Sequence, residues 1–163
     1  MQRRTIHVYA HYLRSFRRIL TTAEAFCAET GRTSDEIMSA RLAPHMQPFC
    51  LHVQLASDFA TDSMDVLVGR QARKLPHTET DLAGLGLRLE AAGTYLTSFQ
   101  SEEFDFVGNQ RIPVSVPSGE MTVSGNSFME LFAKPQFFFH MTMAYAILRQ
   151  MGVPLAETDF MQP

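Results

Sequence analysis

Two histidines near the start of the chain have the spacing of a metal site on a helix. His7 and His11 are four residues apart, so on a helix both imidazoles lie on one face and can bind one transition metal ion. At about 100° per residue, this face points roughly 160° away from the apolar stripe of the same segment. It also carries Arg14 and Arg18, which would repel a dication. We therefore interpret these side chains as a solvated basic surface, which could also touch an anionic partner.

Three further histidines, His45, His52 and His140, are also candidate ligands. His45 and His52 are seven residues apart, so their backbones are separated by roughly 10 Å along a helix, whereas the ligands of one metal each lie about 2 Å from it. His52 borders the apolar face of its segment, and His140 lies on the apolar face of the last helical segment. A buried histidine must find a hydrogen-bond partner or lower its pKa. His52 and His140 are therefore either hydrogen-bonding residues of the core or two metal ligands on facing helices.

Nucleophilic and acid–base chemistry has weaker support. Cys27 and Cys50 have no histidine or lysine at a spacing that would lower a thiol pKa, and we expect both to be reduced, buried thiols. Asp58 and Asp62 are four residues apart and could act as paired acids, but Asp58 points away from the apolar stripe. We expect both carboxylates to face solvent.

The elements that must position these residues follow from hydropathy periodicity. Apolar residues recur with the helical period in four segments, which are 5–29, 46–69, 82–99 and 124–151. Between 104 and 124, β-branched residues flank a turn at Pro117, Ser118 and Gly119, a pattern that predicts a β-hairpin. Thr33 or Ser34 can cap a short helical turn. The pattern predicts one all-α domain over 1–163, an antiparallel four-helix bundle with a small β-hairpin before the last helix.

The last helical segment differs from the others because it is apolar on two sides. One side carries Leu131, Phe138 and Tyr145, and the opposite side carries Phe137 and Ala144. A helix that is apolar all round is buried on both sides, so either neighbouring helices surround it or its second face meets another subunit. We expect a homodimer, since twofold dimers are the commonest oligomers. Pro135 should kink this helix or separate its first turn from the rest.

Size and charge exclude several classes of function. The chain has 163 residues, with 14 Lys and Arg against 17 Asp and Glu. The net charge of -3 offers no overall field for nucleic acid, so we expect no nucleic-acid partner. Apolar runs are shorter than the roughly 20 residues that span a bilayer, and a signal-peptide core is missing from the start of the sequence. We therefore expect a cytoplasmic protein without membrane attachment.

Two long motifs resemble a known bacterial family. The stretch Phe137-Phe-Phe-His140-Met-Thr-Met-Ala-Tyr145-Ala-Ile-Leu-Arg149, followed by Gly152-Val-Pro-Leu and Asp159-Phe160, is similar to the C-terminal signature of a domain of unknown function. Ala40-Arg-Leu-Ala-Pro44-His-Met-Gln-Pro48-Phe and residues 13–25 resemble the same family, so the likeness covers nearly the whole chain. That family is placed with the DinB/YfiT-like four-helix bundles. The resemblance implies their architecture, with a hairpin before the last helix and frequent homodimers.

The resemblance also implies a metal site that this chain matches only in part. In DinB-like relatives one histidine of the second helix and an H-x-x-x-H pair on the fourth hold a metal, and some relatives are metal-dependent thiol transferases or isomerases. Here His52 and His140 match two of these positions, but the position four residues after His140 is Ala144. Gln136 could add a weak oxygen ligand. Two imidazoles fall short of the three protein ligands of a catalytic zinc.

The sequence therefore supports three hypotheses about function. The first is a DinB-like bundle with a small-molecule binding or accessory role, without a complete metal site, whose ligand pocket includes His52, His140 and Tyr145. The second is a metal-dependent enzyme of the thiol-transferase or hydrolase type, in which His52 and His140 bind a divalent metal such as zinc or nickel. The third is a purely structural module that dimerises through its apolar last helix.

Overall fold

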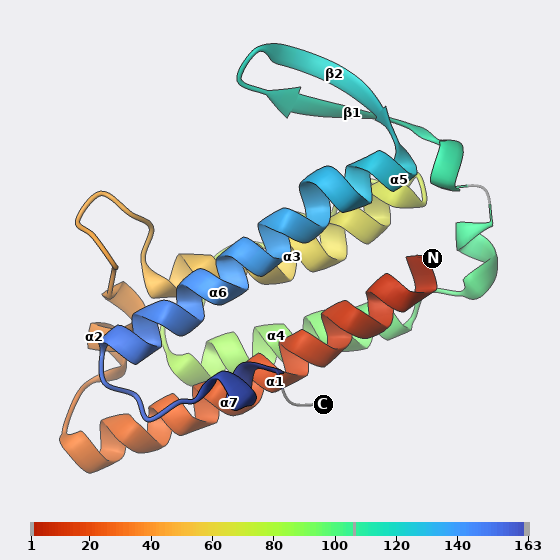
Figure 1. Cartoon of the computed structure of the whole chain (residues 1–163). Helices are drawn as coiled ribbons and strands as arrows, with labels where there is room; N and C mark the ends of the chain where they lie inside the picture. Colours follow the sequence, from red (N-terminus) through yellow and green to blue (C-terminus); the bar gives the residue numbers. More distant parts are fainter. Residues whose placement is uncertain (1, 106, 162–163) are drawn as a thin grey trace.

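Four long helices form the body of the molecule. The computed structural model describes residues 2–105 and 107–161, and Figure 1 shows the arrangement. The long helices are α1 (Gln2–Thr30), α3 (Phe49–Leu67), α4 (Leu82–Thr97) and α6 (Lys134–Gln150). A two-stranded hairpin, β1 (Arg111–Val116) and β2 (Gly119–Ser124), precedes the last long helix. The predicted all-α bundle with a small hairpin is confirmed.

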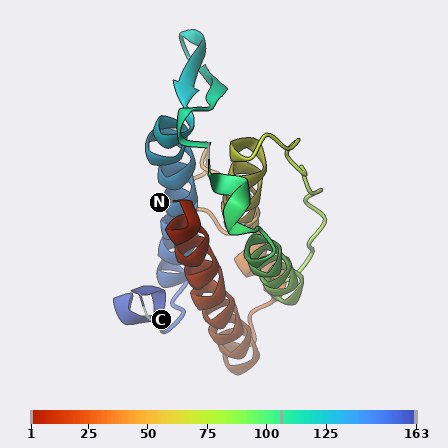
Figure 2. The ribbon, with the colours of Figure 1, turned by 90° about the vertical axis from the view of Figure 1, so that its right-hand side faces the viewer.

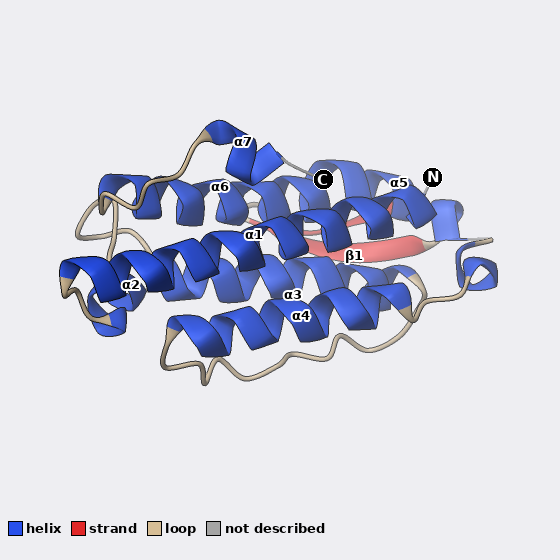
Figure 3. Cartoon of the chain, turned by 90° about the horizontal axis from the view of Figure 1, so that it is seen from below, coloured by secondary structure: helices blue, strands red, loops and turns tan. Residues whose placement is uncertain are grey.

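The helices pack as two antiparallel pairs. α1 lies along α4, and α3 lies along α6, with the members of each pair running in opposite directions (Figures 1 and 3). α3 and α4, which are consecutive long helices, run in the same direction. Residues 68–81 must therefore return along the length of the bundle, and Figures 2 and 3 show them as an extended connection on the outside of α3 and α4. We refer to residues 68–81 as the connecting segment.

Local capping signals set several helix ends. Thr33 caps α2 (Ser34–Ser39) through a capping box, in which Glu36 N donates to Thr33 Oγ1 at 3.3 Å and Thr33 N donates to Glu36 Oε2 at 2.8 Å. α3 begins at Phe49, three residues later than predicted, because Pro48 is extended at the N-cap (φ −73°, ψ 160°). Proline also disfavours helical geometry in the residue that precedes it.

Pro135 separates the first turns of the last helical segment from the rest, as expected. The segment begins as α5 (Gly125–Phe128), widens into the π-helix η3 (Met129–Ala133) and continues as α6, with the proline in its first turn. A proline there has no amide hydrogen to leave unsatisfied. Between α4 and the hairpin lie the 3-10 turns η1 (Ser101–Phe104) and η2 (Val107–Asn109).

A short C-terminal helix covers part of the second apolar face of α6. α7 (Glu157–Met161) was not predicted, because five residues are too few to show a helical period. Its Phe160 ring packs on Tyr145 at 5.6 Å between centroids and on Tyr12 of α1 at 5.4 Å. Tyr12 also packs edge to face on Phe138. Neighbouring helices thus cover part of the face that suggested a subunit contact. Leu131 on the same face stays 68% exposed. The homodimer remains a prediction.

The core consists of the predicted apolar stripes. Its largest fully buried side chains include Tyr9 and Phe16 of α1, Phe49 of α3 and Phe137 of α6. In the part of the chain that the structure describes, no helix has the length and hydropathy needed to cross a bilayer.

Candidate functional site

The structure brings His52 of α3 and His140 of α6 into direct contact. Their Nδ1 atoms are 2.8 Å apart, and the two side chains are 2% and 7% exposed. The contact forms because both residues lie on the faces along which α3 and α6 pack. At this distance one Nδ1 carries a proton and donates it, while the other Nδ1 accepts.

Both imidazoles are neutral near pH 7. Burial lowers the pKa of His140 to about 4, and the neighbouring His52 lowers it further. Burial also lowers the pKa of His52. A neutral pair suits the shared hydrogen bond, because two imidazolium rings would both be donors at Nδ1.

Aromatic rings surround the pair. Phe59 of α3 stacks on the His140 ring at 5.6 Å, with 11° between the planes. Phe139 lies 5.3 Å from His140 and 6.2 Å from His52 between centroids, yet its side chain is 53% exposed. His52 Nε2 is fully buried, and none of the described residues supplies a hydrogen-bond partner for it. A buried imidazole nitrogen without a partner carries a desolvation penalty of about 1–3 kcal/mol, which a ligand atom could relieve.

The residues present do not fit the metal site of the DinB-like relatives. The pair supplies two nitrogens, but Ala144 occupies the third position and lies in the core. Gln136, which the sequence offered as a weak oxygen ligand, has an exposed side chain. Among the described residues, no group of three or more His, Cys, Asp or Glu side chains is placed to hold a metal ion. A catalytic zinc has three protein ligands, so these residues do not complete a site for catalytic zinc or nickel.

Tyr145, the third residue of the predicted pocket, contacts a different neighbour. It lies five residues after His140, about 140° further around α6, and its ring packs on Phe160 of α7. The structure therefore joins His52 to His140 without bringing Tyr145 to them. His7 and His45 are exposed, and His11 is half-buried against Tyr12.

A second buried polar group joins α3, α4 and the connecting segment. Arg88 of α4, 6% exposed, donates from Nε to Ser57 Oγ at 2.7 Å, from Nη2 to Asp58 Oδ1 at 2.5 Å, and from Nη1 to Glu79 Oε1 at 2.9 Å and the Pro76 carbonyl at 3.0 Å. Each guanidinium nitrogen has a partner. We call these five residues the Arg88 cluster.

The Arg88 cluster corrects the prediction that Asp58 faces solvent. The Asp58 side chain is 18% exposed and also contacts His77, whose Nε2 lies 2.7 Å from Asp58 Oδ2. The connecting segment covers this face of α3, which the periodicity of α3 alone does not reveal. Asp62 is half-buried as well. Burial raises its pKa, and the neighbouring Asp58 and Asp65 raise it further.

A third polar contact lies further along the same two helices. The Tyr95 hydroxyl of α4 donates to Asp65 Oδ1 of α3 at 2.5 Å, and the Arg73 guanidinium lies 4.1 Å from the centre of the tyrosine ring. Asp65 is 1% exposed, and its Oδ2 finds no hydrogen-bond partner within the described part of the chain.

The two cysteines are free thiols whose surroundings disfavour the thiolate. Cys27 is buried and Cys50 is half-buried. Burial is the largest influence on both groups and raises the pKa of each thiol. A raised pKa lowers the thiolate fraction at pH 7, so neither cysteine is suited to nucleophilic attack.

Comparison with known proteins places the chain in a family. A family model described as a domain of unknown function, DUF1993, matches residues 1–161. The chain belongs to the DUF1993 family. This DUF1993 protein is also similar to a crystal structure of a DinB family member from Shewanella denitrificans, with 30% identity and a TM-score of 0.89 over 97% of this chain and 89% of the other. The resemblance to a DinB-like domain of unknown function is thus confirmed. No curated protein matches the sequence.

Proposed function

We propose that this DUF1993 protein binds a small, uncharged and largely apolar molecule at His52 and His140. The observation that carries the proposal is the buried His52 Nε2, which has no partner beside a half-exposed aromatic ring. A hydroxyl group on the ligand would complete the hydrogen bonding of the pair. The ligand would reach the nitrogen when Phe139, whose side chain is 53% exposed, rotates into solvent.

The chemistry of the surroundings selects the class of ligand. Both imidazoles are neutral near pH 7 because burial lowers their pKa values, so they offer no counter-charge to a desolvated ion. Phe59 and Phe139 offer aromatic surfaces. Nε2 of a neutral imidazole donates or accepts one hydrogen bond according to its tautomer, and a hydroxyl group can match either state. A compact aromatic or alicyclic alcohol meets these requirements.

A matched pair of probes tests the proposal. We expect 4-methylphenol to bind about tenfold more tightly than toluene, which has nearly the same shape but lacks the hydroxyl group. The affinities can be measured from NMR shift changes of the backbone amides around residues 52 and 140. Equal affinities, or changes confined to other parts of the chain, would contradict the proposal.

Two variants locate the binding. In His52→Phe the preference for 4-methylphenol over toluene should disappear, because the nitrogen that receives the hydroxyl group is gone. His45→Phe makes the same replacement at an exposed histidine before α3 and should keep the preference.

The rival hypothesis, a metal-dependent enzyme, predicts a different metal content. It requires near-stoichiometric zinc, nickel, iron or manganese in protein purified without an affinity tag, and loss of that metal in His140→Ala. The ligand-binding proposal predicts the same low metal content in both proteins, as elemental analysis would show. Stoichiometric metal that depends on His140 would overturn it.

A further inference from the structure

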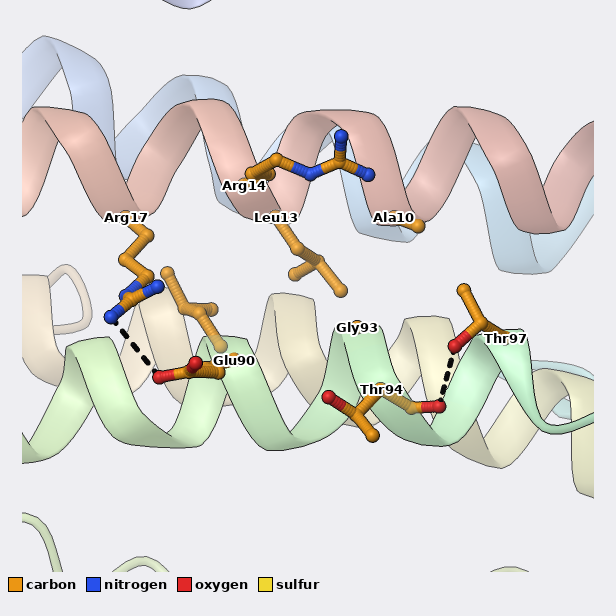
Figure 4. A pocket seen from close by; sticks show the side chains of 9 residues that line it. Ala10, Leu13, Arg14, Arg17, Glu90, Gly93, Thr94 and Thr97 are labelled. Atoms are coloured by element: carbon orange, nitrogen blue, oxygen red, sulfur yellow. Dashed lines mark hydrogen bonds and ion pairs between the residues drawn. The ribbon is translucent and has the colours of Figure 1, made fainter.

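A groove between α1 and α4 lies apart from the histidine pair, which joins α3 and α6. It encloses about 280 Å³, and Figure 4 shows the side chains around it. Its floor is apolar and consists of Ala10 and Leu13 of α1 with Leu89 and the backbone of Gly93 of α4. This volume is near the lower end of the range for small-molecule sites, so it suits a compact ligand.

An arginine lies beside this floor. Arg14 is exposed, and its guanidinium extends along α1 towards Ala10 above the groove (Figure 4). Within residues 2–105 and 107–161, no hydrogen bond or ion pair of Arg14 is observed. Arg14 belongs to the basic surface of α1 that, on the sequence alone, could touch an anionic partner.

An ion pair closes one end of the groove. Arg17 Nη2 of α1 lies 3.1 Å from Glu90 Oε2 of α4, and Arg17 also lines the next hollow along the same two helices. The pair therefore divides the seam into separate hollows and neutralises the Glu90 carboxylate. Thr94 and Thr97 lie at the other end of the groove (Figure 4).

Gly93 keeps the floor of the groove open. A Cβ atom at this position would meet nothing within 4 Å, so close packing within the chain does not require glycine here. Glycine in the interior of a helix is less stable than alanine. The residue thus weakens α4 and leaves space beside Arg14.

We propose that this groove binds a small organic monocarboxylate, with its carboxylate on the Arg14 guanidinium and its apolar body over Leu13 and Gly93. A guanidinium pairs with a carboxylate through two parallel hydrogen bonds. One guanidinium without a partner, beside a neutralised Glu90, matches a single negative charge better than a phosphate dianion. Because the ion pair closes one end of the groove, a compact molecule fits better than a long helix of a second copy.

Benzoate is the first probe, and benzamide is its uncharged counterpart. We expect benzoate to bind with a Kd on the order of 1 mM, a strength typical of a small fragment, and benzamide to bind at least fivefold more weakly. An NMR titration of the full chain should shift the amides of residues 10–17 and 89–97. No shift in these two segments, or equal affinity for both probes, would overturn the proposal.

Two variants with matched controls separate charge from shape. Arg14→Gln should weaken benzoate binding about fivefold to tenfold and leave the affinity for benzamide unchanged. Arg18→Gln is the control, because the Arg18 guanidinium contacts Ser15. It should leave both affinities unchanged. Gly93→Leu should abolish binding by filling the groove. Gly86→Leu is the control, because Gly86 lines the next hollow along α4 and a Cβ there also meets nothing within 4 Å.

The oligomeric state tests whether a second copy of the chain, rather than a carboxylate, occupies the groove. Light scattering on wild type and Gly93→Leu should give the same molar mass, and thermal melting should confirm that both are folded. A wild-type dimer that Gly93→Leu converts to a monomer would show that a second copy fills the groove, which would overturn the proposal.

Discussion

α3 makes buried polar contacts with both α4 and α6, and two of these groups differ in their hydrogen bonding. Against α4, the Arg88 cluster places three guanidinium nitrogens on four acceptors. Against α6, His52 and His140 share one hydrogen bond, and His52 Nε2 has no partner. The first group is charged and closed, and the second is neutral and open for one more hydrogen bond.

The difference separates a structural role from a binding role. Pro76 and Glu79 belong to the connecting segment, so the Arg88 cluster holds this long connection against α3 and α4. The segment is necessary because α3 and α4 run in the same direction (Figure 3). His52 and His140 hold no such connection. They lie against the aromatic rings of Phe59 and Phe139, where a hydrophobic pair would pack equally well.

The largest expected effect is on the Arg88 cluster. Arg88→Ala leaves the Asp58 and Glu79 carboxylates largely buried without their cation, and loss of one member of a buried pair costs about 3 kcal/mol. For a chain of this length we expect Tm to fall by roughly 6–12 °C, as calorimetry can measure. Arg17→Ala breaks the half-exposed pair with Glu90 and should change stability by less than about 1 kcal/mol. Similar losses in both variants would remove the distinction between buried and exposed pairs.

The histidine pair should respond differently when both members are replaced. His140→Leu alone leaves both nitrogens of His52 without partners and should cost about 2 kcal/mol. His52→Leu combined with His140→Leu removes every polar atom of the pair and should lie within about 1 kcal/mol of wild type. Urea unfolding of the four proteins in a double-mutant cycle measures this coupling. Additive losses would mean that the histidines do not act as a pair.

The same pair should make stability depend on pH. The pKa of His140 is about 4 in the folded chain, against about 6.5 in the unfolded chain, so the unfolded state binds more protons between these values. Stability is then full above about pH 6.5 and falls as the pH drops towards 4, by about 2 kcal/mol between pH 8 and pH 5. Urea unfolding of wild type should show this loss. Between pH 8 and pH 5, the free energy of unfolding of the double leucine variant should fall by about 2 kcal/mol less than that of wild type. Identical pH profiles of the two proteins would contradict the lowered pKa of His140.

The smallest effect is expected at the edge of the Arg88 cluster. His77 contacts Asp58, but its side chain is 32% exposed, and Arg88 satisfies the other Asp58 oxygen. His77→Ala should therefore lower the free energy of unfolding by less than about 1 kcal/mol. A loss as large as that of Arg88→Ala would show that the Arg88 cluster also depends on His77, which lies outside it.

The fold was predictable wherever a local pattern was long enough. The 3.6-residue period located four long helices, β-branched residues around Pro117 and Ser118 located the hairpin, and Thr33 and Pro135 acted as their chemistry suggests. α7 is too short to produce a period. The direction of α4 relative to α3 could not be predicted from the sequence either, because it depends on how the connecting segment packs.

The sequence predicted only the part of the candidate site that depends on which helix faces point into the bundle. His52 and His140 both lie on inward faces, so their proximity followed from a bundle, whereas Tyr145 lies about 140° around α6 from His140 and contacts α7 instead. The Arg88 cluster joins residues 9–31 positions apart in sequence. The sequence held one indication that Arg88 is buried: this residue directly precedes Leu89 of the apolar stripe, in a helix with few charges. Its partners still require the tertiary structure.

Nitrogen NMR of the imidazole rings tests the central claim most directly. In tag-free protein at pH 7, the account predicts neutral His52 and His140 rings, each with one protonated and one unprotonated nitrogen. Addition of 4-methylphenol should then shift chiefly His52 Nε2. Doubly protonated rings, or metal-bound shifts that a chelator removes, would contradict a neutral pair that is open for one more hydrogen bond.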